Sequence, residues 1–167
     1  MVTSEPAAVP ATPATVPSRL MLVVVLMLTL LLIAQGLRLF QQDLAFTAAE
    51  TELSFWGRES SYHPREPTIK RTGQTIDALL QQAPQHASYL ELQAYYLSWL
   101  GYWSEDVEQR LRFNDQAVQT QYRALQARPA DRQAWLKMVE YSARTVDGEA
   151  LLAQAQGRAN ALRPVLN

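Results

Sequence analysis

The most strongly patterned stretch of the chain runs from Leu20 to Leu37 and carries no charged side chain, with Arg19 and Arg38 at its two ends. A helix of this length spans ~27 Å at a rise of ~1.5 Å per residue, which approaches the thickness of the hydrocarbon core of a bilayer. Apolar residues cover every face of that helix, so packing against one side of a soluble domain would leave most of them in water. The pattern therefore predicts a transmembrane helix over residues 19–38, in contact with the lipid bilayer.

The segment before this helix, residues 1–18, contains four prolines among alanine and threonine, with Glu5 as its single acid. Such a segment has little to bury, so we expect a disordered tail. Arg19 and the terminal amine stand opposite Arg38 and Arg58, and the positive-inside rule therefore gives only a weak preference for orientation. A short cytoplasmic tail with an exported C-terminal domain is the commoner arrangement for one N-terminal span, and we expect it here.

A cleaved signal peptide is the alternative interpretation of the same stretch. Residues 34–36 (Ala-Gln-Gly) resemble a small-x-small cleavage site after an apolar core. Against cleavage, the region before the core is long and carries one basic residue, and the helical pattern continues past Gly36 without a break. Sequencing the mature N-terminus distinguishes the two, because cleavage predicts a start at Leu37.

Helical periodicity continues beyond the span and predicts an all-α fold. We expect a juxtamembrane helix over residues 39–58, a loop over 59–67 and a helical domain over 68–167. Ser104 is expected to be the N-cap of a helix that ends before Pro129. The juxtamembrane helix is indicated by apolar residues at spacings of three and four, namely Phe46, Ala49, Leu53 and Trp56. No alternating run of β-branched residues occurs that would indicate a strand.

Proline spacing and small residues indicate a helical repeat. Pro129 and Pro164 lie 35 residues apart, and each follows a helix rich in small residues. Residues 116–129 look like the second helix of a tetratricopeptide repeat, and residues 130–138 like the first helix of the next, with Trp135 in the tryptophan position. The interval before this repeat and the second helix of the last repeat depart from the usual pattern. We therefore predict a degenerate tetratricopeptide-like array of about two and a half helical hairpins.

No catalytic, cofactor or metal site can be predicted from the sequence motifs. The chain has no cysteine, and its two histidines, His63 and His86, lack the spacing of zinc ligands. Phosphate-binding loops and the common hydrolase and metalloprotease motifs do not occur. Glu105, Asp106 and Glu108 are explained by the favourable interaction of acids with a helix N-terminus. We expect no enzyme activity, no cofactor and no metal.

Charge gives no indication of nucleic-acid binding, since 13 basic and 15 acidic residues follow Arg38. The remaining candidate surface is aromatic. Packing in the core of a helical stack explains most of these side chains, and a platform for a sugar or a protein partner is the alternative. The candidate residues are Tyr95, Tyr96, Trp99, Tyr102 and Trp103.

From residue 45 to about residue 141 the chain resembles the VpsP-type polysaccharide biosynthesis proteins. The residues that carry the resemblance are 52–56 (ELSFW), 76–80 (IDALL) with Pro84, 86–92 (HASYLEL), Trp99, and the passage from Arg128 to Trp135. These proteins have one N-terminal span followed by a helical domain, and are encoded with machinery that makes and exports exopolysaccharide. The resemblance implies an accessory role and brings no catalytic residues.

Pattern and resemblance together predict a non-catalytic scaffold in a bacterial inner membrane, single-pass, with its C-terminal domain in the periplasm. Its expected partners are proteins of polysaccharide synthesis or export, and the sequence leaves its oligomeric state open. Two alternatives are a structural subunit of a secretion, pilus or cytochrome maturation assembly, and a glycan-binding or polymer-modifying protein.

Overall fold

The computed structural model describes residues 16–57, 62–146 and 148–163. This part of the chain forms six α-helices and no strand, which confirms the all-α prediction for the described residues. The helices are α1 (Val16–Phe55), α2 (Glu66–Gln82), α3 (Ala87–Trp103), α4 (Val107–Ala127), α5 (Arg132–Ser142) and α6 (Glu149–Ala161).

The chain divides into two units, residues 1–41 and 42–167. In the first unit, the large apolar side chains from Leu20 to Phe40 are all 49–70% exposed. The hydroxyl of Thr29 donates to the carbonyl oxygen of Val25 at 2.8 Å, so this polar group is satisfied within the helix. Among the described residues, α1 is the one helix long and apolar enough to cross a membrane.

The first helical boundaries differ from the predicted ones because proline is tolerated in the first turn of a helix. α1 begins at Val16, so the expected tail of residues 1–18 is wrong at its last three positions, and residues 1–15 lie outside the described part. α2 begins at Glu66, inside the loop expected over 59–67. Pro67 stands in its first turn, where no intrahelical amide hydrogen bond is lost.

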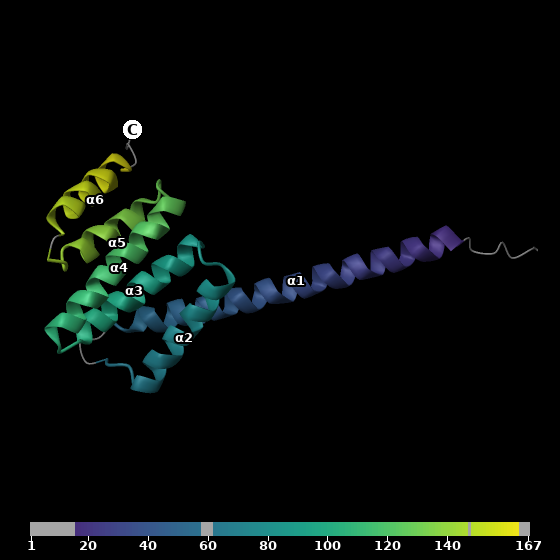
Figure 1. The fold of residues 1–167 in the computed structure, drawn as a ribbon, viewed down its shortest axis with the longest axis horizontal. Coiled ribbons are helices and arrows are strands. Elements are labelled where there is room, and N and C mark those ends of the chain that lie inside the picture. The colour runs from purple at the N-terminus through teal and green to yellow at the C-terminus, as the bar shows by residue number, and fades with distance from the viewer. Residues whose placement is uncertain (1–15, 58–61, 147, 164–167) are drawn as a thin grey trace, which may run out of the picture. The chain divides into compact units, whose positions relative to one another are not determined.

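Helices of the second unit pack in chain order, α2 against α3, α3 against α4, α4 against α5 and α5 against α6 (Figure 1). Two buried clusters hold them. The aromatic cluster joins the end of α1 to α2 and α3, with Ala49, Leu53, Trp56, Ile76 and Leu92 at its centre. The alanine cluster joins α3 to α6 and consists of Ala94, Val118, Leu125, Ala134, Trp135, Met138, Tyr141, Ala155 and Ala159.

Aspartates cap α4 and α5, two of the helices of the alanine cluster. The Asp106 carboxylate accepts hydrogen bonds from the amides of Glu108 at 2.8 Å and Gln109 at 3.1 Å, so Asp106 is the N-cap of α4. The expectation that Ser104 caps this helix is wrong, because Ser104 is instead the C-cap of α3. Asp131 caps α5 in the same way as Asp106 caps α4.

Candidate binding groove

The five aromatic residues singled out from the sequence all lie on α3, but they face different surroundings. Trp99 contacts three of the other four, because residues three and four positions apart share one face of a helix. Its ring centroid lies 6.1 Å from that of Tyr95, 5.5 Å from that of Tyr102 and 5.2 Å from that of Trp103. Trp99 therefore brings four of the five residues together.

Tyr96 points toward α2 instead. Its hydroxyl donates to the carbonyl oxygen of Ile69 at 3.3 Å, and a Cβ added at Gly73 would lie 2.6 Å from the hydroxyl oxygen. Gly73 is thus required for the close approach of this ring to α2. Desolvation raises the pKa of Tyr96, and the negative charge of Asp77 raises it further. Tyr96 is a packing residue between two helices.

The indole faces near the end of α3 are covered by other rings. Trp103 stacks on Trp99, its centroid lies 5.0 Å from that of Trp56, and the His63 ring meets it at 4.9 Å. A sugar needs an open ring face on which to stack, so this arrangement favours the packing interpretation. Of the predicted set, Tyr102 is the ring left mostly open, at 67% exposure. Beside it lies a hollow of about 430 Å³ lined by Trp56, Gly57, Tyr62, His63, Trp99, Tyr102 and Trp103.

A larger hollow, of about 600 Å³, is lined by alternate helices of the second unit. We call it the charged groove. Its lining comes from one face of α1, one face of α3, the turn before α5 and α5 itself. The lining residues are Phe46, Glu50 and Ser54, then Ser88, Glu91, Leu92 and Tyr95, then Arg128, Asp131 and Lys137. Steps of three or four residues along α1 and α3 place these side chains on a single helical face.

Three of the charges in the groove form one ion-pair cluster, with two carboxylates around a single guanidinium. The Arg128 guanidinium forms an ion pair with Glu91 and lies 3.7 Å from the Asp131 carboxylate. Asp131 also accepts the capping hydrogen bonds of α5, so the same carboxylate fixes both the helix start and the arginine. This arrangement ties the turn between α4 and α5 to α3.

Two charges of the groove have no ion-pair partner among the residues that the structure describes. Glu50, on α1, is exposed. Lys137, on α5, is partly exposed, and its ammonium lies 5.8 Å from the centroid of the Tyr95 ring, over which it is held by a cation–π contact. The groove therefore offers a carboxylate from α1 and an ammonium from α5, neither of which has a counter-ion among the described residues.

Sequence reasoning identified Tyr95 in this groove and missed the other residues. The sequence did contain an indication of the groove, because polar residues recur at spacings of three or four along α1 and α3. Whether those two helical faces meet depends on how the helices pack, which the spacing does not show. His63 and His86 each lie against an aromatic ring, Trp103 and Tyr89 respectively. Within the described residues, no cluster of three or more His, Cys, Asp or Glu side chains is arranged to hold a metal ion.

Compared with known proteins, the chain matches no family model, no curated protein and no solved structure. The resemblance to VpsP-type proteins and the tetratricopeptide-like character of the helices stay predictions.

Proposed function

We propose that this protein is a membrane-anchored, non-catalytic scaffold that binds a protein partner through the charged groove. The observation that carries the proposal is the groove itself, in which alternate helices α1, α3 and α5 present polar and aromatic side chains to one hollow. Stacked helical hairpins form extended concave surfaces of this kind and use them to bind other proteins. In our proposal the second unit is a degenerate tetratricopeptide-like array of this type.

The anchor in this proposal is the apolar half of α1, which crosses a bacterial inner membrane once and leaves the C-terminal domain in the periplasm. Support comes from the large exposed apolar side chains between Leu20 and Phe40. Their transfer from water into lipid is favourable by about 25 cal/mol for each Å² of apolar surface. Extraction of membranes with alkaline carbonate should leave the chain in the pellet, and protease added to spheroplasts should digest the C-terminal domain. Release by carbonate contradicts the anchor, and protection from protease contradicts the periplasmic orientation.

The proposed process is exopolysaccharide synthesis or export, and the support for it is the resemblance carried by residues 52–56, 76–80 and 86–92. A clean deletion should lower polymer output while sugar transfer in detergent extracts stays unchanged, because a scaffold organises enzymes without performing their chemistry. The full chain should restore output, and a chain ending at Gly57 should not. Normal polymer output in the deletion strain contradicts the proposal. Loss of secretion, pili or cytochrome maturation instead would indicate one of the other envelope assemblies.

A further inference from the structure

Given the proposed function, we infer that the charged groove takes a peptide segment of the partner with charges of both signs. The segment places a basic side chain against Glu50 and an acidic side chain against Lys137. An apolar side chain lies between them, against Phe46 and the part of Tyr95 that Lys137 leaves open. The inference names the chemistry of the partner and the two residues of this chain that select it.

The dimensions and lining of the groove fit a short peptide segment. A volume of about 600 Å³ is within the range of sites that enclose a compact ligand or a few side chains. Its partly exposed aromatic residues are Phe46 on α1 and Tyr95 on α3, so an apolar side chain of the peptide has a surface to cover. Ser54 and Ser88 add hydroxyl groups that can bond the peptide backbone.

The charge order follows from which side chains are already satisfied. Arg128 is held between Glu91 and Asp131, so it has little positive charge left to offer. Glu50 and Lys137 are the charges of the lining that have no ion pair among the described residues. Complementary charges on a partner fix its direction in the groove and exclude partners with the opposite order. The Tyr95 ring orients the Lys137 ammonium before binding, which reduces the ordering required on association.

The test uses the full chain in nanodiscs of phosphatidylethanolamine and phosphatidylglycerol, panned against a display library of random short peptides. Empty nanodiscs provide the counter-selection. The wild-type chain should enrich peptides that carry a basic and an acidic residue flanking an apolar one. Lys137→Glu should replace the acidic residue of the enriched peptides by a basic one, and Glu50→Lys should replace the basic residue by an acidic one. A synthetic wild-type-selected peptide should bind each reversal variant at least ~10-fold more weakly, because opposed like charges cost more than a missing pair.

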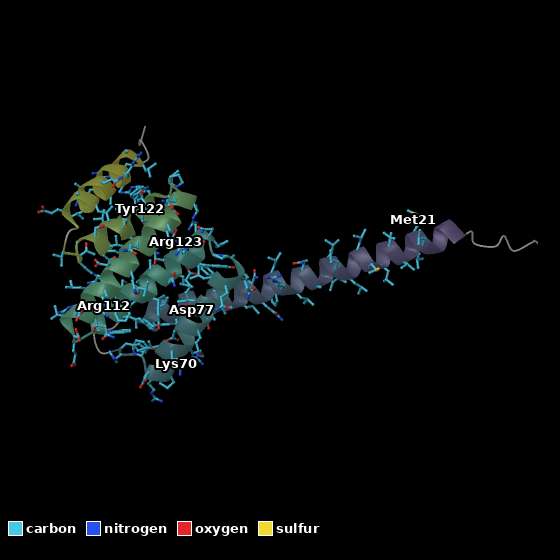
Figure 2. All side chains as sticks on the ribbon, viewed as in Figure 1. Met21, Lys70, Asp77, Arg112, Tyr122 and Arg123 are labelled. Carbon is cyan, nitrogen blue, oxygen red and sulfur yellow. The ribbon has the colours of Figure 1, made fainter. Side chains whose placement is uncertain are left out.

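Lys70→Glu and Asp77→Lys are the matched controls. Both residues are exposed on α2, outside the groove lining, and each control repeats a charge change made in the groove (Figure 2). The selected peptides should bind these variants as they bind the wild type. The double variant Glu50→Lys with Lys137→Glu should bind a peptide with its two charges exchanged. Circular dichroism establishes whether each variant folds. If Lys137→Glu does not fold, Lys137→Gln is used in its place.

Lysine modification gives an independent measurement, because Lys70 and Lys137 are the two lysines of the sequence. A bound synthetic peptide should slow acetylation of Lys137 and leave that of Lys70 unchanged, as read by mass spectrometry. The inference is overturned if no peptide is enriched, if enrichment ignores both charge reversals, or if the peptide leaves Lys137 unprotected. A different result contradicts the proposed function and leaves the inference standing. In that case the peptides bind as expected, but deletion of the chain leaves polymer output normal.

Discussion

The aromatic cluster and the alanine cluster hold neighbouring helices together in two different ways. In the aromatic cluster, large rings from α1 and α3 fill the space between helices, and Trp56 contacts both Tyr96 and Trp103, at 5.9 and 5.0 Å. In the alanine cluster, small side chains let the helices approach, and Ala94, Ala134 and Ala155 are at most 1% exposed. Large side chains tolerate a wide separation of helices, whereas alanines require a narrow one.

This difference predicts opposite sensitivities in the two clusters. Removing atoms should be most damaging where rings span the gap, because the helices cannot close a large cavity. Adding atoms should be most damaging where alanines define the separation. Gly101 of α3 shows how little space the second arrangement leaves, because a Cβ there would lie 2.5 Å from the Asn114 Oδ1 atom of α4.

The largest expected effect is that of Trp56→Ala in the aromatic cluster. Trp56 is 1% exposed, and its Nε1 donates to the Glu52 carboxylate at 3.0 Å. Truncation should lower the free energy of unfolding by about 3–5 kcal/mol, measured by urea denaturation of the full chain in detergent micelles. Tyr102→Ala removes a ring that is 67% exposed and should cost much less. Equal losses for the two variants would mean that the ring contacts do not hold α1 to α3.

Ala124→Leu tests the packing of α4 beside the alanine cluster, next to its member Leu125. Ala124 is fully buried on α4, which packs against both α3 and α5, so a larger side chain there must displace atoms that are already in contact. The added atoms should lower the free energy of unfolding by about 1–3 kcal/mol. Ala127→Leu, three residues later at an exposed position of the same helix, is the control and should be nearly neutral. A stable Ala124→Leu variant would indicate that α4 and its neighbours are loosely packed.

Asp131→Ala should have a smaller effect, confined to the start of α5. The variant loses hydrogen bonds to the amides of Gln133 and Ala134, at 3.0 and 3.1 Å, and the contact with Arg128. We expect a loss of about 1 kcal/mol in the free energy of unfolding, as is usual for an N-cap. Asp131→Asn keeps a capping oxygen and should recover most of that loss. If Asn is as destabilising as Ala, the charge rather than the cap is the stabilising element.

Sequence periodicity predicted the helices well and the groove poorly, for a physical reason. The stripe Phe46, Ala49, Leu53 and Trp56 was recognisable because burial imposes a period on one helix, and these residues do pack in the aromatic cluster. A groove requires that the faces of three helices meet, which no local spacing encodes. The N-cap of α4 was assigned to the wrong residue for a related reason. Ser104 and Asp106 are both good N-cap residues, and which of them caps α4 depends on the path of the chain after α3.

Tyr141→Phe should have the smallest effect at neutral pH and a distinct effect in alkali. Tyr141, in the alanine cluster, is 2% exposed. Burial raises the pKa of its phenol, with Glu140 adding to the rise and Ser98 opposing it. Since the folded-state pKa exceeds the unfolded value, the stabilisation is complete below about pH 10 and is lost as the pH rises above it.

Above about pH 10 the wild-type free energy of unfolding should therefore fall more steeply with pH than that of Tyr141→Phe. A residual slope should remain, because the pKa of Tyr96 in the aromatic cluster is also raised. Urea denaturation of both chains at neutral pH and at several alkaline values measures the difference. At neutral pH the two should agree within about 1 kcal/mol, because the lost hydroxyl is buried and makes no well-formed hydrogen bond to the described residues. If the free energies of unfolding of the two chains fall equally with pH above about pH 10, water reaches the Tyr141 phenol. The helices of the alanine cluster would then be packed less closely than its small side chains imply.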